Sequence, residues 1–136
     1  MGRIVEFESH FDWHAPLPRP GWESTWRTQP GSGAAVLYDL GSHLIDQTLQ
    51  LFGMPQQVTA FLYHQRENGA QWGDADSMTV LLQYEEGPFV TLKASIMNPE
   101  PEQLRLWIRG TKGTYKKVRS FNLNWGFASK LLEPVE

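Results

Sequence analysis

Residues 31–55, GSGAAVLYDLGSHLIDQTLQLFGMP, decide the fold of this chain. Between residues 34 and 52 the apolar side chains recur at intervals of three and four, the spacing of one helix face. They are Leu37, Leu40, Leu44, Ile45, Leu51 and Phe52, with Thr48 on the same face. Ser32 is a suitable N-cap, and Gly53 followed by Pro55 is a typical C-terminal stop. The segment therefore predicts one long helix over residues 34–52.

The remainder of the chain has the character of β-strands. Five runs are rich in β-branched and aromatic residues or alternate between two faces: Ile4–Ser9, Val58–Gln65, Ser77–Tyr84, Phe89–Met97 and Leu104–Arg109. Residues 85–88 (EEGP) predict a hairpin, and residues 110–113 predict a turn into a further extended segment, 114–117. Because the strands are grouped after one helix, the sequence predicts an α+β fold: an open, predominantly antiparallel sheet with one main helix packed on one face.

Composition limits the class of protein. The 136 residues fit a single domain, and an apolar fraction of 40% indicates a folded chain. The net charge is −3 with scattered lysines and arginines, which argues against a nucleic-acid partner. There is no cysteine, no signal peptide, and no apolar run of the roughly 18–20 residues that would cross a membrane. We therefore expect a cytoplasmic protein without a membrane partner.

Asp39 and His43 lie four residues apart on the predicted helix, so their side chains face the same small volume. A carboxylate beside a histidine fixes the imidazole tautomer and stabilises the imidazolium, which makes the histidine a candidate general base. A solvated surface pair is the alternative interpretation of this spacing. Gly41, between the two, costs about 1 kcal/mol relative to alanine in a helix interior. We therefore expect a ligand or another element to approach the backbone at Gly41.

The string from Gly33 to Gln47, followed by LFGMP at residues 51–55, is similar to the signature of the glucose–fructose oxidoreductase / inositol dehydrogenase (Gfo/Idh/MocA) family. It resembles the first helix of the C-terminal domain in that family. VEFESHFD at residues 5–12 resembles the strand that opens the domain, and GTKGTY at residues 110–115 resembles a later turn.

Arg66, Asp74 and Asp76 fall where the family has a charged stretch before its next strands. The likeness covers about residues 3–117 of the single domain 1–136, and residues 118–136 form a divergent tail. WHAP at residues 13–16 replaces the family's arginines around an aromatic residue.

The resemblance implies a fold like the C-terminal domain of glyceraldehyde-3-phosphate dehydrogenase, preceded by a Rossmann domain in the full-length enzymes. It also implies an oxidoreductase that uses NAD or NADP on a sugar, polyol or related hydroxy compound. His43 would exchange the proton of the reacting hydroxyl group, and Asp39 would bind substrate or orient His43. The catalytic lysine of the family belongs to the N-terminal domain and has no counterpart in this chain.

The sequence has no glycine-rich dinucleotide fingerprint after a strand. We expect the cofactor to be bound mainly by a separate N-terminal domain, so that this chain alone holds no cofactor and is inactive. Such a chain is either an excised domain or the product of a truncated gene. The alternative function is a non-catalytic ligand-sensing or dimerisation module that kept the fold without the chemistry.

Two further groups of residues are candidates for binding. Trp22, Trp26 and Arg27, in the proline-rich loop before the helix, either line the substrate side or anchor that loop. His10 and His14 have a spacing that suits a metal on a helix, but their segment predicts a strand and lacks a third ligand, so we expect no metal. We also expect a homodimer through the sheet, because an open sheet needs its second face covered.

Overall fold

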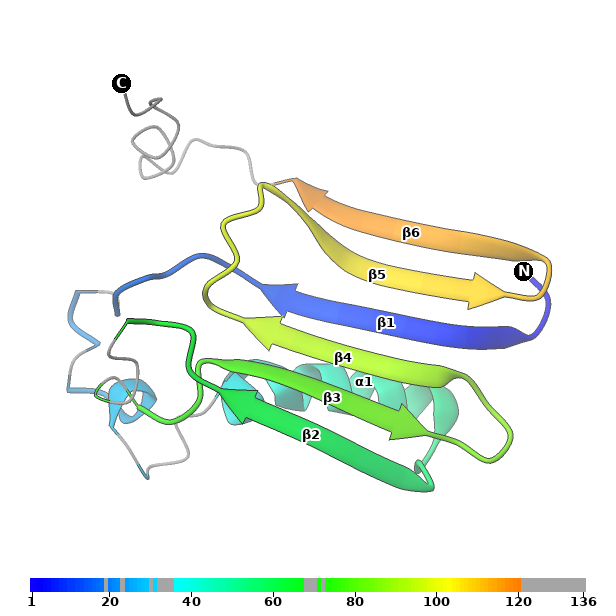
Figure 1. Cartoon of the computed structure of the whole chain (residues 1–136), viewed down its shortest axis with the longest axis horizontal. Helices are drawn as coiled ribbons and strands as arrows, with labels where there is room; N and C mark the ends of the chain where they lie inside the picture. Colours follow the sequence, from blue (N-terminus) through cyan, green and yellow to red (C-terminus); the bar gives the residue numbers. More distant parts are fainter. Residues whose placement is uncertain are drawn as a thin grey trace.

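The computed structural model describes residues 1–18, 20–22, 24–29, 31, 36–67, 71 and 73–120. Its strands are β1 (Ile4–Asp12), β2 (Gln57–Tyr63), β3 (Ser77–Gln83), β4 (Phe89–Ser95), β5 (Glu102–Gly110) and β6 (Gly113–Ser120). They form one sheet in the order β2-β3-β4-β1-β5-β6 (Figure 1). Only the β1–β4 pair is parallel. The N-terminal strand therefore lies in the interior of the sheet, next to β4 and β5.

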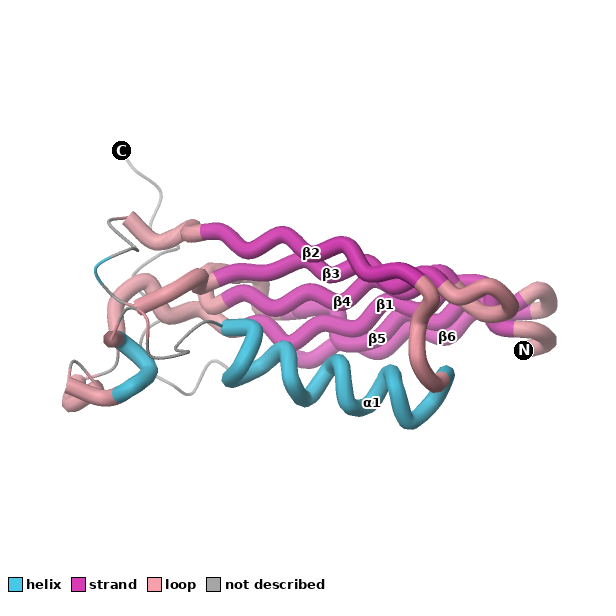
Figure 2. The backbone as a smooth tube through the Cα atoms, turned by 90° about the horizontal axis from the view of Figure 1, so that it is seen from below, coloured by secondary structure: helices cyan, strands magenta, loops and turns pink. Residues whose placement is uncertain are grey.

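The helical elements are a short 3-10 helix, η1 (Trp26–Thr28), a π-helical turn, η2 (Leu37–Gly41), and the main helix, α1 (Ser42–Phe52). Figure 2 shows α1 lying along one face of the sheet. The expected α+β fold with one main helix on an open, predominantly antiparallel sheet is confirmed. The predicted N-cap Ser32 and the first predicted helical residues, Ala34 and Ala35, lie outside the described residues.

The core lies between this helix and the middle of the sheet. Its buried apolar side chains are Phe7, Val36, Leu40, Leu44, Met78, Val80, Leu82, Val90, Leu92 and Ala94. Near the C-terminal end of α1, the ring of Phe52 meets that of Phe7 edge-on, with 5.2 Å between their centroids. The buried residues of β3 and β4 alternate along each strand, and those of the helix recur every three to four residues. These are the two patterns from which the strands and the helix were predicted.

Strand boundaries differ from the expected ones, most clearly in β1, β5 and β6. β1 runs to Asp12, three residues beyond the predicted end, because it pairs along its length with β4 as far as Ser95. β5 begins at Glu102 and contains a bulge between Leu104 and Leu106. β6 continues to Ser120, so the first residues of the predicted divergent tail complete a strand; residues 121–136 lie outside the described part of the chain.

Gly41 is buried where the helix comes closest to β3. A Cβ at this position would lie 2.6 Å from Sδ of Met78, which is itself 1% exposed. The expected close approach therefore comes from a neighbouring strand. Glycine is needed because any side chain would push against the fully buried Met78.

We expect Gly41→Ala to lower the free energy of unfolding. Overpacking a core typically costs about 1–3 kcal/mol, and the better helix propensity of alanine returns only about 1 kcal/mol. In a Met78→Ala background the same change should be neutral or stabilising, because the space is already vacated. Urea unfolding of the four proteins of this double-mutant cycle measures the coupling. An equal effect of Gly41→Ala in both backgrounds would contradict this explanation.

In the described part of the chain, no helix covers the opposite face of the sheet (Figure 2). Strand register places two kinds of side chain there. Apolar residues gather on β2 and its neighbours: Phe61, Tyr63, Leu81 and Phe89. Charged residues occupy the centre, where Glu6 pairs with Arg109 at 2.7 Å and Glu8 with Lys93 at 3.5 Å. We call this surface the open face.

His10 belongs to the charged part of the open face. Its ring nitrogens lie 2.6 Å from Glu8 and 3.3 Å from Asp12. Burial alone would lower the pKa of His10, but the hydrogen bonds and negative charges of Asp12 and Glu8 outweigh it and raise the pKa above its ordinary value. The described residues contain no cluster that could hold a metal ion. None of the described helices is long and apolar enough to cross a membrane.

Candidate functional site

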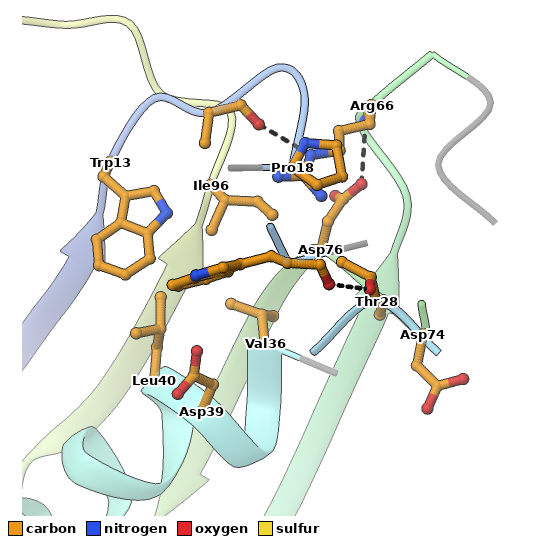
Figure 3. A pocket seen from close by; sticks show the side chains of 13 residues that line it. Trp13, Pro18, Thr28, Val36, Asp39, Leu40, Arg66, Asp74, Asp76 and Ile96 are labelled. Carbon is orange, nitrogen blue, oxygen red and sulfur yellow. Dashed lines mark hydrogen bonds between the residues drawn. The ribbon is translucent and has the colours of Figure 1, made fainter. Parts of the chain in front are cut away.

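A pocket lies where the start of the helix meets the ends of β1 and β3 and the loop that follows β1 (Figure 3). Its lining residues are Trp13, Ala15, Pro18, Trp22, Thr28, Val36, Asp39, Leu40, Arg66, Asp74, Ala75, Asp76 and Ile96. Two indole rings thus share the pocket with three carboxylates and one guanidinium. Such a mixture of aromatic surface and a few polar groups is typical of sites for small polar molecules.

Asp39 and His43 are both on the helix but do not occupy the same place. Asp39 lines the pocket, and Figure 3 shows its carboxylate directed into it. His43 is exposed and is not among the lining residues. No hydrogen bond between these two side chains is found. The prediction of a single Asp–His unit on one helix face is therefore refined: the two residues are neighbours along the helix with different surroundings.

The π-helical turn explains this separation. The amide of Ser42 donates to the carbonyl of Leu37, five residues earlier. The carbonyl of Tyr38, which an α-helix would offer to that amide, instead accepts the Ser42 hydroxyl at 2.8 Å. The wider turn changes the angle between side chains before and after it, so four-residue spacing no longer places Asp39 directly above His43. Turns of this kind are frequent at functional sites.

His43 contacts the aromatic side chains at the end of β1. Its ring is stacked against Phe11, with 6.4 Å between centroids and 30° between planes. Phe11 in turn meets Trp13 edge-on at 6.0 Å, and Trp13 lines the pocket. The guanidinium of Arg105, at the β5 bulge, lies 4.5 Å from the Phe11 centroid. Phe11 and Trp13 thus connect His43 to the pocket wall.

The three loop residues predicted to bind substrate have different positions. Trp22 lines the pocket, and its carbonyl accepts hydrogen bonds from Thr25 and from Thr28, which is buried. Trp26 begins η1, is 43% exposed, and is not a lining residue. The side chain of Arg27 lies outside the described part of the structure. Trp22 is therefore the loop residue that the geometry brings to Asp39.

Residues 74–76 hold the walls of the pocket together. The Asp74 carboxylate accepts from the Gly31 amide at 3.0 Å, and the Ala75 carbonyl accepts from Val36, at the start of the helix, at 2.8 Å. Asp76 is 5% exposed and accepts from the amides of Gln65 and Arg66 at 2.8 and 3.0 Å. The tripeptide 74–76 therefore fixes both the helix that carries Asp39 and the segment that carries Arg66.

Arg66 reaches from this segment to the loop after β1. Its Nε donates to the Ala15 carbonyl at 2.9 Å. Figure 3 shows this hydrogen bond and the one from the Arg66 amide to Asp76. Burial lowers the pKa of Arg66, while the negative charge of Asp76 opposes that shift. An arginine remains a cation under these conditions. Among the lining residues that the structure describes, it is the one positively charged side chain.

Sequence reasoning missed Trp13 as a lining residue and did not assign a task to Arg66 or Asp76. The sequence marks Trp13 only as a departure from the family pattern. The alternation of β1 could have placed it, because Phe7, Phe11 and Trp13 are all odd-numbered and all face the helix. For Asp76 no local signal existed, since its hydrogen bonds to residues 65 and 66 depend on how the connection between β2 and β3 folds back.

We expect Asp76→Ala to destabilise the chain by about 1–3 kcal/mol, because two backbone amides lose their acceptor in a partly buried place. Asp74→Ala is the matched control. It removes one exposed bond to Gly31 and should change stability by no more than about 0.5 kcal/mol. Urea unfolding followed by tryptophan fluorescence measures both. Equal losses in the two variants would show that Asp76 has no special part in holding residues 65 and 66.

The sequence and the structure of this chain are both similar to those of known oxidoreductases. The sequence model for the GFO/IDH/MocA C-terminal domain matches residues 1–116. YdgJ, an uncharacterized oxidoreductase of Escherichia coli, is 35% identical over 117 residues, which are 86% of this chain and 31% of YdgJ. The scyllo-inositol 2-dehydrogenase (NADP(+)) IolW of Bacillus subtilis is 58% identical over 50 residues, 37% of this chain and 14% of IolW.

Among solved structures, the YPO2259 protein of Yersinia pestis is similar with a TM-score of 0.71 and 36% identity, covering 87% of this chain and 30% of that one. The chain spans about a third of the length of the curated relatives that it matches over most of its own length. Those relatives therefore contain about two further thirds of sequence with no counterpart in these 136 residues.

Proposed function

Because this chain belongs to the GFO/IDH/MocA C-terminal domain family, we propose that it forms the substrate side of an NAD(P)-dependent oxidoreductase acting on a sugar, polyol or related hydroxy compound. The observation that carries the proposal is the pocket at the start of the helix, with Asp39, Trp13 and Trp22 in its wall. Carboxylates accept hydrogen bonds from hydroxyl groups, and indole faces cover the C–H surface of a ring. The cytoplasmic location expected from the sequence stays a prediction.

In this proposal His43 exchanges the proton of the reacting hydroxyl group. Two observations support it: the imidazole is exposed, and it is stacked against Phe11, which meets the pocket-lining Trp13 edge-on. An imidazole nitrogen can both accept and donate a proton, which suits a group that must take and return one. Asp39 accepts a hydrogen bond from a substrate hydroxyl group, and Trp22 packs against the substrate. For Trp26 and Arg27, the only support is their place in the loop before the helix.

The described residues do not themselves fit a dinucleotide. A nucleotide site of the expected kind needs a strand that leads through a glycine-rich turn into a helix, within a parallel sheet. Here the one parallel pair, β1 and β4, is joined through a helix and two antiparallel strands, and the described turns lack that arrangement. NAD or NADP is therefore proposed to be bound mainly by a separate N-terminal domain. The contribution of this chain is the substrate pocket and the proton exchange.

We expect His43→Ala to lower kcat by about 10²–10⁴-fold, the usual contribution of a general base. The enzyme for this test is the chain joined to the nucleotide-binding domain of a full-length relative, assayed by reduction of NAD or NADP with scyllo-inositol as substrate. Gln50→Ala, an exposed change two turns further along α1, is the control and should leave kcat unchanged. Near-normal turnover in His43→Ala would contradict the role of His43.

A second candidate function is a non-catalytic ligand-sensing or dimerisation module. It is favoured by the open face, where Phe61 is 55% and Phe89 is 42% exposed. Exposed apolar side chains on an uncovered sheet favour association with another sheet. We propose a homodimer through this face, which is compatible with both functions. A joined enzyme that binds scyllo-inositol and NADP but has no turnover would favour the non-catalytic module.

We expect Phe61→Glu to convert a dimer into a monomer, because it buries an unpaired charge in the proposed interface. Val58→Glu is the matched control: Val58 lies on the same strand, is 61% exposed, and faces the helix side of the sheet. Light scattering at micromolar concentration gives the molar mass of both variants and the unchanged chain. A monomer for the unchanged chain, or a dimer for Phe61→Glu, would contradict the proposed interface.

A further inference from the structure

The described residues use only part of the hydrogen-bond donor capacity of Arg66. A guanidinium carries five N–H groups in a planar fork. The Nε–H group is taken by the Ala15 carbonyl. For the two terminal nitrogens, the described residues supply no hydrogen-bond partner. Arg66 lines the pocket, so a molecule bound there is a candidate partner for these nitrogens.

The surrounding residues hold Arg66 in place before any ligand arrives. Its main-chain amide is bound to Asp76, and its Nε to Ala15, whose own amide donates to the Ile96 carbonyl at 2.7 Å. The arginine is therefore tied to two separate parts of the pocket wall. A side chain that is ordered beforehand loses less conformational entropy on binding than a free one, which favours affinity.

We propose that Arg66 determines ligand specificity, its terminal nitrogens donating to two adjacent hydroxyl oxygens of an uncharged polyhydroxy compound, with Asp76 as the positioning residue. This inference rests on the proposed function of the pocket and adds the group that selects the ligand. The planar fork matches two neighbouring acceptor oxygens, an arrangement that a lysine ammonium cannot offer.

An uncharged ligand fits the pocket better than an anion. Among the described lining residues, three carboxylates (Asp39, Asp74 and Asp76) accompany one guanidinium, and this excess of negative charge favours an uncharged ligand over an anion. A hydroxyl group both accepts and donates, so one diol can accept from Arg66 and donate to the carboxylate of Asp39. The oxygens of an ionised ligand carboxylate can only accept and would leave Asp39 without a donor from that group. Trp13 and Trp22 supply apolar surface for the C–H groups.

The test is an NMR titration of the 136-residue chain, labelled with nitrogen-15, with two probes: scyllo-inositol, which is uncharged, and D-glucuronate, which carries a carboxylate. The indole N–H signals of Trp13 and Trp22 report binding. We expect scyllo-inositol to move both signals and to bind more tightly than D-glucuronate. Arg66→Met should weaken scyllo-inositol binding by at least about tenfold, the value of one or two hydrogen bonds to a charged group.

Three variants serve as controls. Arg66→Lys keeps a cation but not the fork and should also bind more weakly. Arg109→Met removes an arginine on the open face and should bind as the unchanged chain does. Asp76→Asn should shift the Arg66 Nε–H signal and weaken binding, whereas Asp74→Asn should leave that signal in place. A stable Nε–H signal in Asp76→Asn would overturn the positioning role.

The possible failures are distinguishable. If scyllo-inositol binds equally well to the unchanged chain and to Arg66→Met, the inference is wrong while the proposed substrate pocket stands. Tighter binding of D-glucuronate that is lost in Arg66→Met would make Arg66 an anion-binding residue and overturn the preference for uncharged ligands. If scyllo-inositol moves neither indole signal in the unchanged chain, the proposed function of the pocket fails, and the inference fails with it.

Discussion

The contact between the helix and the middle strands supports everything else in this molecule. Leu40 and Leu44 on the helix meet Met78 on β3 and the buried side chains of β4, and Gly41 lets the two backbones come close enough for these contacts to form. In the described part of the chain, one main helix covers one face of the six-stranded sheet, so apolar burial forms a single layer there. Loss of this layer would destabilise both the sheet and the pocket at its end.

The position of β1 links the core to the pocket. As the N-terminal strand it inserts between β4 and β5, and its odd-numbered side chains face the helix. Phe7 therefore packs in the core and Phe11 against His43, while Trp13 reaches the pocket. The same strand thus contributes first to stability and then, as it leaves the covered part of the sheet, to the surroundings of the candidate catalytic histidine.

Polar residues around the pocket either bind the protein's own backbone or face the inside of the pocket, and the sequence does not show which of the two a given residue does. Asp74 and Asp76 bind backbone amides of the protein, so much of their capacity is used internally. Asp39 points into the pocket from the helix (Figure 3). Arg66 has both tasks in our proposal, since its Nε binds the loop after β1 and its terminal nitrogens, without a partner among the described residues, would bind the ligand. Substrate recognition and the integrity of the wall are therefore connected through one side chain.

The sequence by itself determined the elements and the fold class, because these depend on local periodicity: recurrence every three to four residues in the helix, alternation in β3 and β4, and glycine or proline where elements end. It also placed Asp39 and His43 on one helix and anticipated the close approach at Gly41. Only the tertiary structure decided that the helix begins with a π turn, which directs Asp39 into the pocket and leaves His43 against Phe11. It likewise decided that Asp76 holds Arg66. The π turn depends on how the hydroxyl and the amide of Ser42 divide the carbonyls of Tyr38 and Leu37 between them. The position of Arg66 depends on contacts between residues far apart in the chain. Sequence periodicity reports neither.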